Sequence, residues 1–372
     1  MDSRPVHNEL HVRSLVWRVL GGQVLGFLEV LYFFIGVGLL GMLISQHVSF
    51  VKYGACDAEV AEAITALSGE AQILELRVNR NLSKAEKRGE DGRIEDSTAF
   101  RFSTDRRLLL VPREQISGSQ IGLHEVVIEP DSQCFGSFAS KSLIKYVLGH
   151  EVILLNVFRR AVEKEKMRGY LYGYSDHKLY PLEPPADNNW WSVYRGKFAA
   201  CVTSLFLMHT MSGLITFSLR HIQVRILKLS VDLRAYMLSQ ISCSALEVIV
   251  HYALDAIVFV PIITGVLYFL REFFEDLFFS FMVVLVAWMR EVVLLVNARH
   301  WANEKRLQQL LSAYFFTFHL YFFCFPMGYS WLALFTCTLF MQHAVIMTWN
   351  RSIRRHSIYA SNVNALSPLH LL

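Results

Sequence analysis

Long apolar stretches alternate with short polar segments along this chain of 372 residues. The hydrocarbon core of a bilayer is about 30 Å thick, so a helix needs about 20 apolar residues to cross it. The fifth stretch is near the lower limit of about 17 residues, and the others are longer. The pattern predicts six membrane-spanning helices: Gly22–Ile44, Phe198–Leu219, Leu246–Phe269, Leu277–Val296, Leu307–Phe323 and Trp331–Trp349.

Basic residues of the connecting segments fall on one side of the predicted membrane. Basic residues near a span resist translocation, so this asymmetry predicts that both termini are cytosolic. The apolar run of the first span exceeds the roughly 7–15 residues of a signal-peptide core, which favours an uncleaved anchor over a cleaved signal peptide. The cytosolic set comprises Arg4, Arg13, Arg18, Arg220, Arg225, Lys228, Arg234, Arg299, Lys305, Arg306, Arg351, Arg354 and Arg355, and the two short opposite loops hold only Arg271.

Composition agrees with a membrane protein. Hydrophobic residues make up 53% of the chain and charged residues 18%, whereas soluble domains have about 45–50% and about 25%. The net charge of +4 reflects the cytosolic loops rather than a clustered basic face of the kind that binds nucleic acid.

The segment 46–196, between the first two spans, is long enough for a domain of its own. By topology it is lumenal, and its pattern predicts an α+β fold. Apolar residues from Leu148 to Val162 recur at helical spacing, and Gly169 is placed to end that helix. Four short β-branched or alternating runs predict strands at Gln72–Asn81, Thr98–Thr104, Arg106–Pro112 and Leu123–Pro130.

Two cysteines and one glycosylation motif lie in this predicted domain. Cys56 and Cys134 are its only cysteine pair, and an oxidising lumen favours a disulfide between them over two free thiols. Asn81 begins an Asn-Leu-Ser acceptor on the same side of the membrane. Asn350 begins a second acceptor triplet, which the topology places in the cytosol, where it should stay unmodified.

No motif of enzymatic chemistry occurs in the sequence. The chain has no Cys-x-x-Cys, Gly-x-Ser-x-Gly or His-Glu-x-x-His, no phosphate-binding loop and no histidine boxes. We therefore expect a protein that is not an enzyme and that has no metal and no cofactor.

Polar residues within the predicted spans are the remaining candidates for a site. Glu247, His251 and Asp255 recur every four residues along one face of the third span. Such groups are costly in hydrocarbon, so they should face the bundle and find partners. They either hold the helices together through hydrogen bonds or form an ion path or a groove for client helices. The other candidates are His319, Gln342 and His343, and further polar residues are Glu29, His209, Arg290 and Glu291.

The segment Arg220–Ile241 has apolar residues on one helical face and basic residues on the other. Two interpretations fit this pattern equally well. It is either an amphipathic helix in the cytosolic headgroup plane or a simple extension of the second span.

In order along most of the chain, these features resemble the membralin family of endoplasmic-reticulum membrane proteins. The likeness rests on the anchor followed by Cys56, the strand leading to Asn81, and the helix and Gly169-Tyr170 that precede the second span. One departure is that the chain ends soon after the sixth span, without the Pro/Ala-rich tail of animal members. The matching short motifs are Glu129-Pro130, Asp131–Gly136 (DSQCFG), Glu272–Phe274 (EFF), Trp288, Tyr329–Leu334 (YSWLAL) and Phe340–His343 (FMQH).

The resemblance implies a non-catalytic subunit, a scaffold or substrate-engaging adaptor, in endoplasmic-reticulum-associated degradation of membrane proteins. Its implied partners are a membrane-embedded RING-type ubiquitin ligase, ubiquitin-like-domain membrane proteins and client membrane proteins. The alternative is a small ion or proton transporter or channel, although no internal repeat supports it. A lumenal receptor or adhesion role is a third possibility.

The sequence thus predicts an α-helical polytopic membrane protein of about six transmembrane helices with a lumenal α+β domain between the first two. The expected segments are a cytosolic start (1–19), the anchor (20–45), the lumenal domain (46–196), the second helix (197–219), the amphipathic helix (220–244), helices three to six (245–349) and a cytosolic tail (350–372).

Overall fold

The structure is a computed structural model. In it the chain forms two compact units. The helical unit comprises 1–39, 199–324 and 333–372, and the β-sheet unit comprises 40–198 and 325–332. The structure describes residues 4–54, 71–79, 97–111, 122–129, 132–174, 177–183, 190–239, 250, 257, 259–300 and 304–366.

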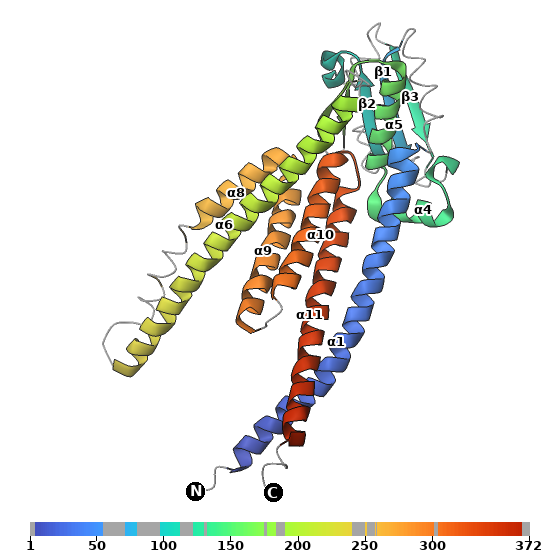
Figure 1. The fold of residues 1–372 in the computed structure, drawn as a ribbon. Coiled ribbons are helices and arrows are strands. Elements are labelled where there is room, and N and C mark those ends of the chain that lie inside the picture. The colour runs from blue at the N-terminus through green and yellow to red at the C-terminus, as the bar shows by residue number, and fades with distance from the viewer. Residues whose placement is uncertain are drawn as a thin grey trace, which may run out of the picture. The chain divides into compact units, whose positions relative to one another are not determined.

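Long helices account for the helical unit (Figure 1). Among the described residues, four helices are long and apolar enough to cross a membrane, at Gln23–Lys52, Val193–Val224, Leu277–Asn297 and Ser330–Ser352. They confirm the first, second, fourth and sixth predicted spans. The helices are α1 (Arg4–Gln46), α6 (Trp190–Ser239), α8 (Phe259–Phe274), α9 (Leu277–His300), α10 (Glu304–Cys324) and α11 (Ser330–Leu366).

Among the described residues, the third and fifth predicted spans do not form helices that are both long and apolar enough to cross a membrane. The third is represented by the 16 residues of α8, and most of Leu246–Val258 lies outside the described residues. Helix α10 forms over the fifth, but its first turns carry charged and amide side chains, beginning at Glu304, that lower its hydropathy. Leu307, Leu311 and Phe315 on the same helix are nevertheless 1% exposed. One face of α10 is therefore packed against protein.

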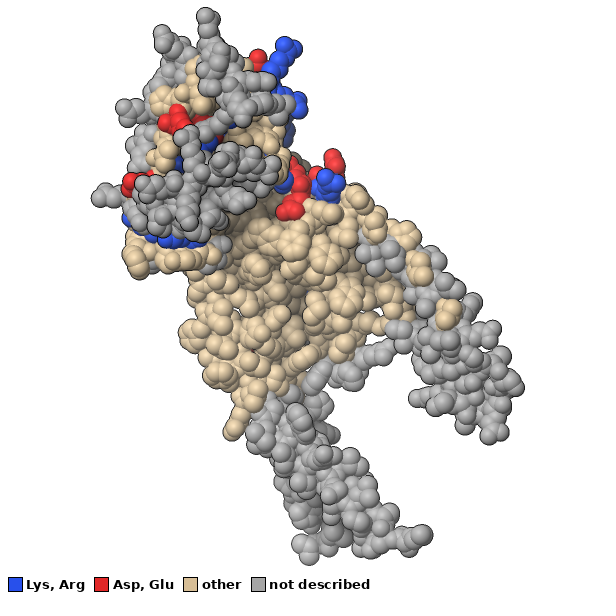
Figure 2. Space-filling model, turned by 180° about the vertical axis from the view of Figure 1, so that it is seen from behind, with Lys and Arg blue, Asp and Glu red and all other residues tan. Residues whose placement is uncertain are grey.

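The described part of the segment Arg220–Ile241, up to Ser239, continues the second span without a break. Helix α6 runs for 50 residues, from Trp190 to Ser239. This continuity agrees with the second interpretation, in which the segment is an extension of the second span. Figure 2 shows a broad uncharged surface over the described helices on the face in view, with charged side chains at one end.

The β-sheet unit contains a five-stranded sheet in the order β3-β1-β2-β4-β5. Strand β1 pairs antiparallel with β2 and parallel with β3, and β4 joins β2 and β5 in antiparallel pairs. Three of the predicted strands are confirmed as β1, β2 and β3, whereas β4 and β5 were not predicted. The bounds are β1 (Ala71–Asn79), β2 (Ser97–Ser103), β3 (Gly122–Ile128), β4 (Gly169–Gly173) and β5 (Leu179–Leu182).

The strand predicted at Arg106–Pro112 is wrong. The segment Arg106–Leu110 forms a short 3₁₀ helix, η3, which begins where the Asp105 carboxylate accepts a hydrogen bond from the Arg107 amide at 2.9 Å. Arg101 Nη1 also donates to the Val111 carbonyl oxygen at 2.9 Å. The Arg101 side chain thus donates the hydrogen bond that the Val111 carbonyl oxygen would accept from a neighbouring strand. This tertiary contact overrides the β-like residue pattern of the segment.

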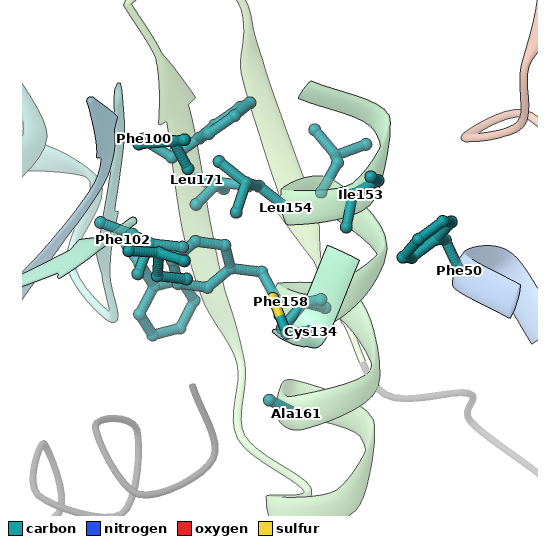
Figure 3. Packing of buried hydrophobic residues seen from close by; sticks show 14 of the residues in the cluster. Phe50, Phe100, Phe102, Cys134, Ile153, Leu154, Phe158, Ala161 and Leu171 are labelled. Carbon is teal, nitrogen blue, oxygen red and sulfur yellow. The ribbon is translucent and has the colours of Figure 1, made fainter. Parts of the chain in front are cut away.

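Helix α5 (Glu151–Glu165) packs on the sheet and confirms the predicted helix. Figure 3 shows its side chains meeting those of β2 and β4, with Phe158 against Phe102. The prediction that Gly169 ends the helix is wrong. The chain turns at Lys166, whose φ of 51° is left-handed, and Gly169 begins β4 under the Phe102 ring, where a Cβ atom would overlap it.

Besides η3, four short helical elements are described in the β-sheet unit. They are η1 (His47–Lys52), which continues α1, the pair α4 (Phe138–Leu143) and η5 (Ile144–Leu148), and η4 (Gln133–Phe135). Phe50 of η1 is 1% exposed and belongs to the same hydrophobic core as α5 and the sheet. The end of the first span is therefore part of the folded core of this unit.

Candidate functional site

The helical unit contains a buried ion pair, Arg290 and Glu291 on α9, which is bonded to α6. The Glu291 carboxylate accepts hydrogen bonds from Ser212 Oγ at 2.6 Å and Thr216 Oγ1 at 3.0 Å. Arg290 Nη2 bonds the same carboxylate and donates to Ser212 Oγ at 2.8 Å. Ser212 and Thr216 are four residues apart and share one face of α6. The two hydroxyls and the ion pair therefore fix α6 against α9.

Helix α10 covers the other side of Arg290. The guanidinium carbon lies 5.4 Å from the centroid of the Phe315 ring, a cation–π distance. His319 lies one turn further along α10, with its ring 4.4 Å from that of Phe315 and its Nδ1 2.8 Å from the Phe315 carbonyl oxygen. Since a carbonyl only accepts, Nδ1 carries the hydrogen. Arg290 Nε and Nη1 and His319 Nε2 are buried without a hydrogen-bond partner among the described residues.

A second set of contacts joins α1, α9 and α11. Asn350 Nδ2 donates to the Glu29 carboxylate, and Trp349 Nε1 donates to Asn297 Oδ1 at 3.0 Å. Gly36 faces the Phe340 ring at ordinary contact distance. Polar groups on facing membrane helices typically contribute about 0.6–2 kcal/mol each when they bond across the interface. These pairs accordingly serve to hold the helices in register.

The described candidate residues from the sequence, His319, Gln342 and His343, do not share one environment. His319 is fully buried beside Phe315, whereas His343 is half-buried with its ring 5.4 Å from that of Phe33. Gln342 is exposed on α11. The stripe of the third span, Glu247, His251 and Asp255, lies outside the described residues.

Of the residues that meet around Arg290, sequence reasoning selects His319 as a candidate and none of the hydrogen-bonded partners. The sequence identifies Glu29, Arg290 and Glu291 as polar residues inside spans without singling them out as candidates. Ser212 and Thr216 could have been found by their four-residue spacing, which is the one relevant signal in the sequence. Nothing in the sequence pairs Asn297 with Trp349, because their neighbourhood depends on the packing of two helices.

A second buried ion cluster lies in the β-sheet unit. Glu75 on β1 is 1% exposed and accepts from Arg77 Nη2 at 2.7 Å. Its other oxygen lies 3.6 Å from Arg101 Nη2 on β2. Arg77 Nε also lies 3.3 Å from Glu125 on β3, whose side chain is 39% exposed. The cluster links three neighbouring strands, with Glu75 joined to Arg101 on β2 and Arg77 joined to Glu125 on β3.

The chemistry available in these clusters is hydrogen bonding and charge pairing. Among the residues that the structure describes, no group of three or more His, Cys, Asp or Glu side chains could hold a metal ion. The described cysteines with free thiols are Cys201, Cys324 and Cys337.

The disulfide between Cys56 and Cys134 stays a prediction, since Cys56 and the acceptor Asn81 lie outside the described residues. Cys134 is 7% exposed in the core of the β-sheet unit. We expect either single Cys→Ser change to lower the free energy of unfolding of this unit by about 2–4 kcal/mol, with the double change no worse than either. Alkylation of the denatured, non-reduced protein checks the bridge, and full labelling of both thiols would contradict it.

Comparison with known proteins places this architecture in a family. The family model described as "Membralin: Tumour-associated protein" matches residues 48–292. A membralin-like protein of Arabidopsis thaliana is 31% identical over 257 residues, which are 68% of this chain and 40% of that relative. The chain thus spans less than half the length of this relative, and no solved structure matches it. The chain belongs to the membralin family.

Proposed function

We propose that this protein is a non-catalytic membrane subunit, a scaffold or substrate-engaging adaptor, in endoplasmic-reticulum-associated degradation of membrane proteins. The observation that carries the proposal is the family match over residues 48–292. The matched region includes residues 48–198 of the β-sheet unit and the contacts of α6 with α9. In this proposal the β-sheet unit is lumenal and both termini are cytosolic.

The internal contacts suit a scaffold. The Ser212, Thr216 and Glu291 bonds and the Trp349–Asn297 bond tie helices from distant parts of the chain to one another. A helix bundle fixed in this way presents constant lipid-facing surfaces to other membrane proteins. The catalytic step would belong to a separate RING-type ubiquitin ligase, and ubiquitin-like-domain membrane proteins would assist recruitment.

Affinity purification in mild detergent, with mass spectrometry of the retained proteins, tests the proposal. We expect a membrane-embedded ubiquitin ligase and ubiquitin-like-domain membrane proteins among the partners. We also expect membrane-protein clients to persist longer in cells that lack the chain, with normal turnover after its return. Unchanged client lifetimes together with no ligase among the retained proteins would contradict the adaptor role.

The proposed topology gives a separate prediction. Asn81, but not Asn350, should be glycosylated in a host that modifies acceptor sites, because only the lumenal side meets the transferase. Glycosidase treatment should shift the mobility of the wild-type chain and of Asn350→Gln, but not of Asn81→Gln. A glycosidase-sensitive shift that survives Asn81→Gln would reverse the assignment of sides.

The alternative, an ion or proton transporter or channel, has one observation in its favour. Arg290 and His319 carry buried nitrogen atoms without partners among the described residues, and such atoms can line a path for ions. Reconstitution into liposomes separates the two functions. We expect no proton or ion flux above protein-free liposomes, and a flux that His319→Leu or His343→Leu removes would favour the transporter.

A further inference from the structure

Helical segments α4 and η5 expose two aromatic rings on the surface of the β-sheet unit. Phe138 is 87% exposed and Tyr146 is 77% exposed, the highest values among large hydrophobic side chains of the described residues. Lys145 is also exposed, with its Nζ 5.7 Å from the centroid of the Tyr146 ring. Exposed apolar side chains gathered on one short helical segment mark a candidate contact surface.

The opposite face of the same segment is held firmly. Ile144 is fully buried in the core of the β-sheet unit. Ser140 Oγ accepts a hydrogen bond from Gln46 Nε2 at 3.2 Å, and Ser137 caps the first turn by accepting from the Ser140 amide. Since these contacts fix the rotation of the segment, the exposure of Phe138 and Tyr146 is built into the fold.

The bond to Gln46 sets the depth of α4 in relation to the bilayer. Gln46 belongs to the candidate span Gln23–Lys52, just after the apolar run that ends at Ile44. It follows Val24 by 22 residues, a helical rise of about 33 Å, which slightly exceeds a hydrocarbon core of about 30 Å. Gln46, and with it α4, therefore lies at the level of the lipid headgroups.

The chain beyond Gln46 supports this boundary. Phe50 is buried in the core of the β-sheet unit, and Arg160 Nη1 donates to the Phe50 and Val51 carbonyl oxygens at 2.7 and 3.0 Å. Lys52 Nζ lies 5.2 Å from the Tyr53 ring centroid. Three of the four candidate spans have an end within the residues of this unit. The polypeptide backbone therefore connects this unit directly to the ends of three candidate spans.

Basic and aromatic side chains on one helical face are typical of an interfacial helix. Phe138, Lys141 and Lys145 recur at spacings of three and four, which places them on one side of α4 and η5. Rings favour the boundary between headgroups and acyl chains, and ammonium groups are attracted to lipid phosphates. Figure 2 shows basic side chains along an edge of the β-sheet unit, next to uncharged surface.

We propose that α4 and η5 lie in the lipid headgroup layer, with Phe138 and Tyr146 inserted among the headgroups and Lys141 and Lys145 on lipid phosphates. The occupant of this surface is the bilayer in which the protein itself is embedded. The contact sets the height and tilt of the β-sheet unit above the membrane. This inference is independent of the proposed role in degradation.

Photocrosslinking of the full chain in its native membrane tests the proposal. A photoreactive phenylalanine analogue is placed at position 138, 146 or 106, and phospholipid adducts are measured by mass spectrometry. Position 106 is the matched control, because Arg106 is also exposed but follows the opposite end of the sheet. Arg106 comes just after Ser103, which lies at the same end of the sheet as Leu123 of β3. Helix α4 instead follows the Ile128 end of β3 in the chain.

We expect several-fold more phospholipid adduct at positions 138 and 146 than at position 106. Equal lipid adduct at all three positions, or adducts at 138 and 146 with protein alone, would overturn the proposal. The second outcome would identify the surface as a protein interface.

Charge reversal tests the lysine contacts in vesicles that contain anionic phospholipid. Combining Lys141→Glu with Lys145→Glu should reduce the lipid adduct at position 138 several-fold. Lys164→Glu, an exposed lysine of α5, should leave it unchanged. Gel filtration in detergent verifies that each variant remains folded, and an unaltered adduct yield in the folded double variant would reject the phosphate contacts.

Discussion

Replacing Arg290 with leucine should lower the free energy of unfolding of the helical unit by about 3–5 kcal/mol. The change leaves the Glu291 carboxylate, whose side chain is 11% exposed, without its cation. Hydrogen bonds from Ser212 and Thr216 remain, but hydroxyl dipoles do not neutralise a buried charge. Thermal unfolding of the full chain in detergent measures the effect as a lower midpoint for the helical segments.

Two further variants separate charge from packing. Arg271→Leu alters an exposed arginine at the end of α8 and should cost less than about 1 kcal/mol. The double change Arg290→Leu with Glu291→Leu removes both charges, so it should be more stable than Arg290→Leu alone. If Arg290→Leu unfolds no earlier than Arg271→Leu, the ion pair does not stabilise the bundle.

The apolar runs predicted the membrane-spanning helices because hydrocarbon imposes a length on any helix that crosses it. The spans at Gly22–Ile44 and Leu277–Val296 are confirmed for this reason. Alternating residues likewise predicted β1, because a half-buried strand has a period of two. These signals are local, so they can be found from sequence alone.

The errors arise where contacts between distant residues decide the structure. The leucine-rich segment Arg106–Leu110 has a strand-like pattern, yet Asp105 and Arg101 hold it as a 3₁₀ helix. Glycine often ends a helix, but Gly169 lies in β4 under the Phe102 ring. A side chain at this position would overlap the ring, so the strand needs a glycine there.

The candidate site shows the same division between local and distant information. The cost of burying charge in a membrane correctly predicts that Arg290 and Glu291 require partners. Helical periodicity gives the face of each residue but not the helix that it meets. Ser212 is 79 residues from Glu291 in sequence, so the contact depends on how α6 and α9 pack.

In the β-sheet unit, Glu75→Leu should lower the free energy of unfolding by about 3–5 kcal/mol. Glu75 is the carboxylate shared by Arg77 and Arg101, and Arg101 is 3% exposed. Without Glu75 the buried Arg101 guanidinium keeps its bond to the Val111 carbonyl oxygen but loses its counter-charge. Hydrogen–deuterium exchange of peptides from β1 and β2 in the full chain measures the loss as faster exchange.

Glu125→Gln is the matched control on the neighbouring strand. Its carboxylate pairs with the same Arg77 but is 39% exposed, so water compensates for the lost charge and the cost should stay below about 1 kcal/mol. Glu75→Gln keeps an acceptor oxygen and should fall between the two. Equal exchange rates in Glu75→Leu and Glu125→Gln would show that burial does not strengthen this cluster. The larger cost expected at Glu75 than at Glu125 follows from the degree to which each carboxylate is removed from water.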